Sequence, residues 1–395
     1  MKKTIALILL LLTAIHAYTQ SSNGIAETLR SIAANNMELK MNDYQSLVVK
    51  SQYAAANALP APAVSYTRQY GNREGLGING ELIASQSLDF PTLYAQRSKL
   101  FRSKAQSLDL RQAELRRQIL LEAKEICLDL IMLRKESKLL AERLGNATQL
   151  EALYSKRLET GDANRIETNK ISLELLNVKT EARRNATAVQ AKLKELETLN
   201  GGEPLDFDAT LYEAVEEPAS FDELCSEVLD IDPGLNALRS ELSLAGQALR
   251  VSKAGWLPSL ELGYQLNTAT GGERFNGFLV GINIPVFSNR HKVRQAKAET
   301  IYAGLRYDDA AMKNRNELLQ LHRLSLALKE SMNEYDKLLE NRDNLPLLNK
   351  ALDSGRISVI EYFVEVASLY DSLRNYMQLE NEYQKTVARM LRHRL

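Results

Sequence analysis

The chain has 395 residues, and its 50 basic and 50 acidic side chains give it no formal net charge at pH 7. This balance argues against nucleic acid as a partner, because proteins that bind nucleic acid carry a basic excess. Beyond the N-terminal segment no run of about 18 apolar residues occurs, which excludes a membrane-spanning helix from the remainder of the sequence.

The N-terminus has the pattern of a secretory signal peptide. Two lysines precede an apolar run over residues 5–15, and small or polar residues follow it. This pattern predicts a signal peptide over residues 1–20 that is cleaved between Ala17 and Ser21. The first cysteine is Cys127, so the cleavage region offers no attachment point for a lipid.

Two segments, residues 60–91 and 257–285, show the alternation of apolar with small or polar residues that is typical of β-hairpins. In the second, apolar residues alternate with small or polar ones on both sides of a loop: Leu260, Leu262, Tyr264 and Leu266, then Phe278, Val280, Ile282 and Ile284. This period of two predicts strands with one apolar face and one small or polar face. Each strand has about 9–11 residues, the length of a tilted transmembrane β-strand.

A very long helix is expected after each hairpin, over residues 92–160 and 288–354. Pro346 is the only internal proline, and apolar residues recur at spacings of three and four. Such helices would be roughly 100 Å long at about 1.5 Å per residue, which implies a coiled coil or a helical repeat. Return helices over residues 165–199 and 359–391 complete two helical hairpins.

The two halves of the chain repeat each other. Lys, Leu, Gly, Ile and Glu of residues 156–167 recur at one constant offset in residues 350–361. Glycine just beyond a helix end, followed by Asn or Ser before the next helix, is typical of a turn. Gly161 and Gly355 are therefore predicted to form the tips of the helical hairpins.

We accordingly divide the sequence into two structural repeats, residues 21–200 and residues 221–395. Each repeat is expected to contain a helix, a β-hairpin, a long helix and a return helix. Residues 201–220 are expected to be the linker between the repeats.

Four strands cannot close a barrel, because about eight is the practical minimum, and open sheet edges are not tolerated in lipid. Strands from several copies must therefore be combined, and three copies supply twelve. We predict a mostly α fold with a small β part. Long coiled-coil helical hairpins and two β-hairpins per chain would form a trimeric twelve-stranded β-barrel and an α-helical barrel. The alternative is a soluble protein with two surface hairpins on a coiled-coil rod.

The sequence shows no sign of an enzyme. Cys127 lies within a helical pattern, where cysteine behaves as a small buried hydrophobe, so a disulfide with Cys225 is not expected. His291, His322 and His393 are far apart, and no nucleophile-elbow, zinc-protease or phosphate-loop motif occurs. We expect no catalytic residue, no cofactor and no metal site.

In this order, the elements resemble the TolC family of outer-membrane efflux proteins. The resemblance covers essentially the whole chain after the signal. It includes Pro91 and Pro285 at the strand-to-helix junctions, and a tip glycine followed by Ile-Glu five and six residues later. Residues 86–94 and 354–362 are closest to the CusC/CzcC-like branch, which accompanies heavy-metal efflux pumps.

The chain also departs from the family in two places. Many CusC-like members carry a lipobox cysteine, which is absent here. An aromatic residue usually precedes the tip glycine, whereas this chain has Leu158 and Leu352. These departures concern lipid anchoring and packing at the tips, and they leave the expected fold unchanged.

The resemblance implies a homotrimer in the outer membrane with a large periplasmic portion. Its barrel would contact outer-membrane lipid, and its helical barrel would extend into the periplasm. The tip residues Gly161, Asp162, Gly355 and Arg356 would dock to a periplasmic adaptor, or membrane fusion protein. The adaptor would in turn contact an inner-membrane RND-type pump.

The resemblance also implies that acidic residues ring the pore at its narrowest point. Glu361 lies six residues beyond Gly355, Glu365 is one helical turn further on, and Glu167 is the equivalent of Glu361 in the first half. The alternative interpretation is that all three glutamates are solvated surface charge.

Aromatic residues gather at the expected strand–helix junctions, at Phe90, Tyr94, Trp256 and Phe287. They are candidates for an aromatic girdle at the membrane interface. Ordinary packing at a joint is the alternative.

Three functions are compatible with these patterns. The first is a passive export conduit in a tripartite efflux system, with heavy-metal cations as the cargo of the CusC-like branch. The second is the outer-membrane channel of a type I protein secretion system. The third is a structural coiled-coil protein of the cell envelope without a pore. The alternation of apolar and small residues in the strands argues against this third function.

Overall fold

The computed structural model describes the chain over residues 24–73, 75–215, 220–285, 289–339 and 344–395. The signal peptide predicted over residues 1–20 and the aromatic Phe287 lie outside these ranges. The described residues fall into two compact units, and each unit combines segments from both halves of the sequence. We call them the helical unit, residues 24–40, 115–228 and 315–395, and the sheet unit, residues 41–114 and 229–314.

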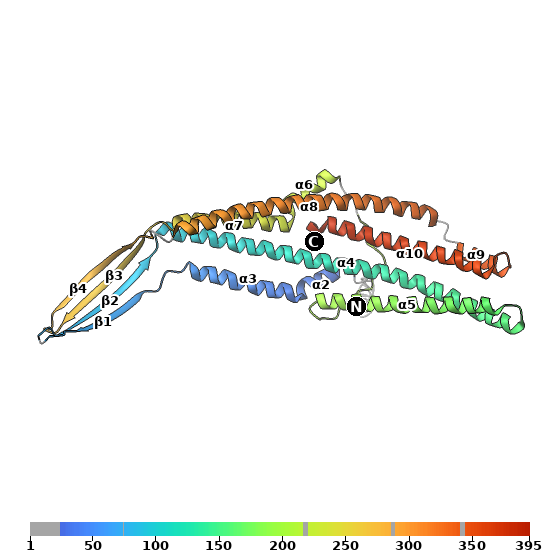
Figure 1. Cartoon of the computed structure of the whole chain (residues 1–395), viewed down its shortest axis with the longest axis horizontal. Helices are drawn as coiled ribbons and strands as arrows, with labels where there is room; N and C mark the ends of the chain where they lie inside the picture. Colours follow the sequence, from blue (N-terminus) through green and yellow to red (C-terminus); the bar gives the residue numbers. More distant parts are fainter. Residues whose placement is uncertain (1–23, 74, 216–219, 286–288, 340–343) are drawn as a thin grey trace, which may run out of the picture. The chain divides into compact units, whose positions relative to one another are not determined.

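The sheet unit holds one antiparallel sheet whose strands are neighbours in chain order (Figure 1). The strands are β1 (Ala63–Tyr70), β2 (Ile78–Leu88), β3 (Ser259–Ala269) and β4 (Arg274–Asn283). β1 and β2 form one hairpin, β3 and β4 form the other, and β2 pairs with β3. The two predicted β-hairpins are therefore confirmed, and they join into a single sheet.

The register of the strands sorts the side chains into two faces. Leu82 pairs with Tyr66 on one side and with Leu266 on the other. Tyr264 pairs with Phe278, and their rings meet edge to face with centroids 6.3 Å apart. Side chains alternate between the faces of a sheet, so these residues share one face, which we call the apolar face. The opposite polar face includes Ser65, Ser85, Gly263 and Gly281.

Each hairpin of the sheet is flanked by helices in the chain. These are α3 (Met37–Ala56) before β1, α4 (Pro91–Thr160) after β2, α7 (Pro233–Ala254) before β3 and α8 (Asn289–Leu339) after β4. Within the sheet unit, Glu241 of α7 ties two of them together. Its carboxylate lies 2.7 Å from Arg111 of α4 and 2.9 Å from Arg306 of α8.

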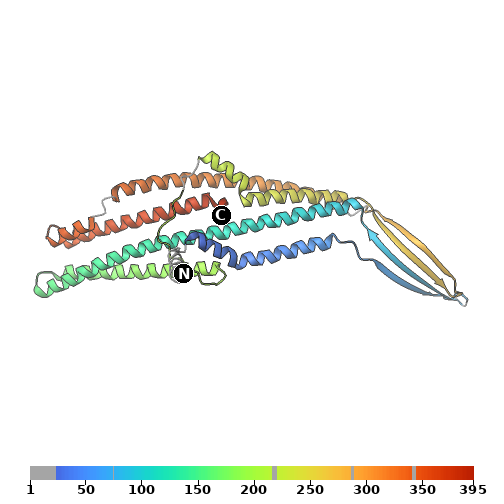
Figure 2. The ribbon, with the colours of Figure 1, turned by 180° about the vertical axis from the view of Figure 1, so that it is seen from behind.

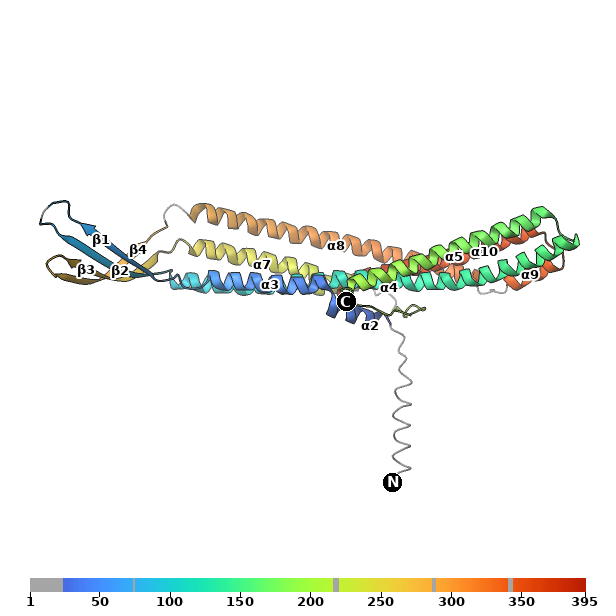
Figure 3. The same ribbon diagram turned by 90° about the horizontal axis from the view of Figure 1, so that it is seen from below.

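The helical unit contains two helical hairpins. Besides parts of α3, α4 and α8, its elements are α2 (Ile25–Asn35), α5 (Arg165–Leu199), α6 (Phe221–Ile231, in part), α9 (Asn344–Asp353), α10 (Val359–Met390) and the short 3-10 helix η1 (Arg392–Arg394). α4 and α5 form the first hairpin, as Figure 2 shows from behind. α9 and α10 form the second (Figure 3). Among the described residues, none of the helices has the length and apolar character that would let it cross a membrane.

One predicted helix is divided in the structure. The sequence predicts a single helix over residues 288–354, whereas the structure describes α8, which ends at Leu339, and α9, which begins at Asn344. Pro346 lies in the first turn of α9, where its missing N–H group removes no intrahelical hydrogen bond. The same proline would disrupt the middle of a continuous helix.

The segment expected to be a linker, residues 201–220, contributes Phe207 to the core of the helical unit. Phe207 is fully buried there, together with Ile32 and Leu196. Arg134 of α4 donates hydrogen bonds to the carbonyl oxygens of Phe207 and Ala209, and its guanidinium lies 5.4 Å from the centre of the Phe207 ring. Phe207 therefore belongs to the core, whereas many of the other described residues of this segment are exposed.

Both cysteines are buried and free. Cys127 belongs to the core of the helical unit, and burial raises the pKa of its thiol to about 12. The prediction that Cys127 acts as a small buried hydrophobe is confirmed.

Candidate functional site

The tips of the two helical hairpins share one backbone geometry. Gly161 has φ = +80° and Gly355 has φ = +67°, in the left-handed region that favours glycine. Their N–H groups donate to the carbonyl oxygens of Leu158, at 3.2 Å, and Leu352, at 3.0 Å. No heavy atom lies within 4 Å of a Cβ built at either glycine. Glycine is therefore required at both tips by backbone conformation rather than by crowding.

The residues after the two glycines complete the turns. The N–H of Asp162 donates to the Arg157 carbonyl at 2.7 Å, and that of Arg356 donates to the Ala351 carbonyl at 2.9 Å. These bonds satisfy carbonyl groups that a helix end otherwise leaves without partners. Asp162 and Arg356 are both exposed, so these equivalent positions carry charges of opposite sign.

Two of the predicted pore residues cap the return helices. Glu167 accepts a hydrogen bond from the N–H of Asn164 at 3.2 Å, and Glu361 accepts one from the N–H of Ser358 at 2.8 Å. Asn164 and Ser358 in turn accept bonds from the N–H groups of Glu167 and Glu361, at 3.2 Å in both cases. Each pair is a capping box, which satisfies N–H groups at the helix start.

The capping boxes could have been recognised in the sequence, because Asn or Ser followed three residues later by Glu is their signature. In Glu361 the hydrogen bond from the Ser358 backbone, assisted by the Ser358 side chain, lowers the pKa of the carboxyl group below its usual value. Glu361 therefore remains ionised at neutral pH, and its carboxylate is exposed.

Glu365 has different surroundings from Glu361. It lines an open groove between α9 and α10, together with Leu347, Leu348, Ala351, Ser368, Leu369 and Ser372. The structure thus places Glu361 at a helix start and Glu365 beside the neighbouring helix of the same hairpin. The two residues share α10, but Glu361 caps the helix whereas Glu365 lines the groove.

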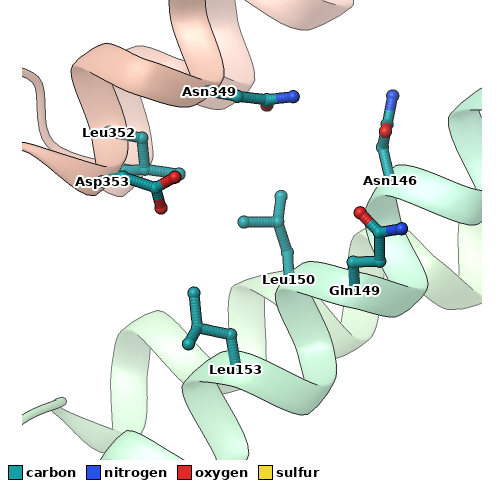
Figure 4. Close-up of a pocket in the computed structure, with 7 residues that line it drawn as sticks. All are labelled: Asn146, Gln149, Leu150, Leu153, Asn349, Leu352 and Asp353. Atoms are coloured by element: carbon teal, nitrogen blue, oxygen red, sulfur yellow. The ribbon is translucent and has the colours of Figure 1, made fainter. Parts of the chain in front are cut away.

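A small cavity of about 160 Å³ lies between α4 and α9, within the helical unit (Figure 4). Leu150 and Leu153 of α4 line one side, and Leu352 and Asp353 of α9 line the other. Asn146, Gln149 and Asn349 complete the lining. The two helical hairpins therefore meet here through a surface that is partly apolar and partly amide.

Tyrosines supply the aromatic bulk near the tips. Tyr154, Tyr362 and Tyr370 are buried in one cluster with Leu352. The hydroxyl of Tyr362 donates to Asn349 Oδ1 at 2.7 Å, and Asn146 Nδ2 donates to the Tyr370 hydroxyl at 3.4 Å. The leucine at position 352 is therefore accommodated in a packed cluster, whereas Leu158 at the other tip is 38% exposed.

Ion pairs between charged side chains connect the two helical hairpins at some distance from the tips. Arg143 of α4 lies 2.5 Å from Glu174 and 3.3 Å from Glu181, both on α5. Arg374 of α10 lies 2.9 Å from the same Glu181 and 3.5 Å from Glu136 of α4. Because Glu181 is shared, the chain of ion pairs joins three helices of the helical unit.

The sheet leaves its apolar face uncovered in the described part of the chain. Phe278 is 91% exposed, and Val280 is 71% exposed. β1 and β4 each have a strand partner on one side only, so both edges of the sheet are open among the described residues. An apolar face and two open edges are costly in water, and they mark a surface that other molecules or copies cover.

The helices next to the open edges carry exposed apolar stripes. On α3, which leads into β1, these residues are Met41, Tyr44, Leu47 and Val48. On α8, which follows β4 in the chain, they are Ile301, Tyr302, Leu305 and Met312. Both stripes belong to the sheet unit, and their helices adjoin the two edge strands in the chain.

The aromatic residues at the strand–helix junctions differ in their surroundings. Trp256 is 46% exposed and Phe90 is 37% exposed. Tyr94 instead accepts a hydrogen bond from the Asp89 N–H at 3.2 Å, and Arg97 pairs with the Asp89 carboxylate at 2.7 Å. Tyr94 thus takes part in the junction between β2 and α4.

Comparison with known proteins finds likeness in structure alone. No family model and no curated protein matches the sequence. A membrane protein from Pseudomonas aeruginosa superposes with a TM-score of 0.79 at 17% identity, over 93% of this chain and 89% of that one. CusC superposes with a TM-score of 0.76 at 18% identity, over 93% and 92% of the two chains. The CmeC outer membrane channel from Campylobacter jejuni superposes with a TM-score of 0.78 at 14% identity, over 93% of this chain and 85% of that one.

The chain has the fold of an outer membrane channel. The expected mostly helical fold of the single chain, with its small antiparallel sheet, is therefore confirmed over nearly the whole chain. CusC and CmeC match about equally well, so the comparison does not distinguish the CusC-like branch from other channels of this fold.

Proposed function

We propose that the protein is an outer-membrane channel of the TolC family, built from three copies, through which an efflux system exports its cargo. The sheet is the observation that carries this proposal. It has one exposed apolar face, one polar face and two open edges. Such a sheet is stable in lipid only if copies join edge to edge into a closed barrel.

The two edges of the sheet unit are suited to that closure. β1 and β4 are antiparallel to their inner neighbours in a four-stranded sheet, so β4 of one copy can pair antiparallel with β1 of the next. The exposed stripes on α8 and α3 would meet in the same junction. Three copies would supply twelve strands, and every edge would be paired.

The tips support docking to a periplasmic adaptor, which would connect the channel to an inner-membrane RND-type pump. Both turns are exposed and have open space around their glycines. Gly161, Asp162, Gly355 and Arg356 would form the contact surface. Other residues would strain the two turns, whereas glycine adopts their backbone conformation freely. The shape of the contact surface therefore depends on Gly161 and Gly355.

Heavy-metal cations are the cargo that the CusC-like sequence of residues 86–94 and 354–362 favours. Among the described residues, no group of three or more His, Cys, Asp or Glu side chains is placed to hold a metal ion. In this proposal the chain acts as a passive, non-enzymatic conduit and leaves cargo selection to the pump.

Purification in detergent followed by mass measurement and single-channel recording tests the function. We expect three chains per particle and a conductance in planar bilayers. A strain without the gene should be more sensitive to copper, silver or zinc salts. Recovery of a soluble monomer without detergent would contradict the channel architecture, and unchanged metal sensitivity would contradict only the cargo.

A ring of Glu361 side chains is proposed to narrow the pore, with Glu365 and Glu167 nearby. Glu361→Gln should weaken cation selectivity and block by divalent ions, because glutamine keeps the capping hydrogen bond but removes the charge. Ser358→Ala is the matched control, since it removes the cap and keeps the charge. Reversal potentials in a salt gradient measure the effect. The proposal would be wrong if the reversal potential of the wild type were unchanged in Glu361→Gln and in the double variant Glu361→Gln with Glu365→Gln. Both glutamates would then be solvated surface charges.

A further inference from the structure

The charged residues of the sheet are sorted by face. The described strands contain four of them: Arg68 on β1, Glu81 on β2, Glu261 on β3 and Arg274 on β4. The register places both arginines on the apolar face, because Arg68 pairs with Gly80, Gly80 with Thr268, and Thr268 with Arg274. Both glutamates fall on the polar face, which carries no basic residue.

Each glutamate has one close neighbour on the polar face. The Gln265 side chain of β3 donates a hydrogen bond to Glu81 Oε1. Glu261 lies against Gly281 of β4, where an added Cβ would be 3.4 Å from Glu261 Cβ and 3.5 Å from its Oε2. Neither carboxylate forms an ion pair with a described residue, so neither negative charge is neutralised locally.

The two glutamates lie at different levels of the sheet. Glu81 pairs with Asn267, and Asn267 is separated from Glu261 by six positions along β3. At about 3.3 Å per residue this separation is about 20 Å. Glu81 is near the loops at one end of the strands, and Glu261 is near the helices at the other.

We propose that Glu81 and Glu261 make the sheet-lined part of the pore selective for cations. This inference rests on the proposed function, because three copies are needed to enclose the polar face. The enclosed surface would then carry two rings of three carboxylates, one near each end of the strands, with no basic residue from the strands. The arginines would lie on the outer, lipid-facing side of the wall.

Screening sets the conditions under which this selectivity is visible. The Debye length is about 8 Å at 0.15 M salt and about 30 Å at 0.01 M. Carboxylates on the wall of a twelve-stranded barrel are therefore partly screened from the centre of the pore at physiological salt. In dilute salt they act across the whole lumen, so the preference for cations should rise as salt is lowered.

The test is single-channel recording of purified trimers in KCl gradients between about 0.01 and 0.1 M. Glu81→Gln combined with Glu261→Gln should lower the ratio of cation to anion permeability by about twofold or more. Each single variant should produce part of this change, because each removes one of the two rings. Arg68→Gln, on the apolar face, is the matched control and should leave the ratio unchanged.

The recordings are made both in the wild-type chain and in chains that carry Glu361→Gln and Glu365→Gln, so that the tips do not dominate the current. An unchanged permeability ratio in both backgrounds would overturn the inference while leaving the channel intact. An equal shift in Arg68→Gln would also overturn it. Absence of trimers or of any conductance would instead contradict the proposed function.

Discussion

Export should be lost when valine replaces Gly161 or Gly355, although trimers still form. Both glycines have positive φ, and a β-branched residue in that region is strained by about 1–2 kcal/mol. No atom lies near enough to either position to clash with a new Cβ. The substitution therefore acts on the conformation of the turn, and the turn is the surface that we propose for the adaptor.

Gly202→Val separates backbone strain from docking. Gly202 has φ = +87° and nothing within 4 Å of its built Cβ, so the substitution imposes similar strain away from the tips. Drug or metal sensitivity of cells that carry each variant measures export, and mass measurement in detergent measures assembly. Normal export in both tip variants would rule out the tips as the docking surface. Loss of export in Gly202→Val as well would show that strain alone explains the effect.

The sequence was sufficient for those features that depend on local chemistry. The positive φ of Gly161 and Gly355 follows from the turn pattern, and α5 spans Arg165–Leu199, the expected range. The alternation from Leu260 to Leu266 predicted β3 and its apolar face. In each case the sequence of one short segment was enough to predict the feature.

Other features depend on partners that are distant in the sequence. Phe207 looked like part of a linker, but Arg134 and the core of the helical unit bury it. The sorting of Arg68 from Glu81 by face needed the register between strands, which no single strand specifies. The capping role of Glu361 was readable from Ser358, but this residue was interpreted only as a pore residue or as solvated surface charge.

Phe278→Arg should prevent stable assembly in the membrane, whereas Leu279→Arg, one residue further along the same strand, should be tolerated. Phe278 lies on the apolar face, is 91% exposed and is near the middle of β4. Arginine on the lipid side of a barrel costs about 2–4 kcal/mol at the bilayer midplane. Three copies would therefore add about 6–12 kcal/mol to the free energy of the assembled trimer.

Leu279 provides a control at nearly the same depth. It pairs with Gly263 on the polar face, which would line the water-filled pore, so its arginine would remain hydrated. The measurement is the amount of heat-resistant trimer in the outer-membrane fraction. Each 1.4 kcal/mol is a factor of ten in an equilibrium constant, so the trimer of Phe278→Arg should be undetectable while that of Leu279→Arg stays near the wild-type amount. Equal amounts for the two variants would mean that the apolar face does not contact lipid. The reverse pattern would mean that the polar face contacts lipid, and would also move Glu81 and Glu261 out of the pore.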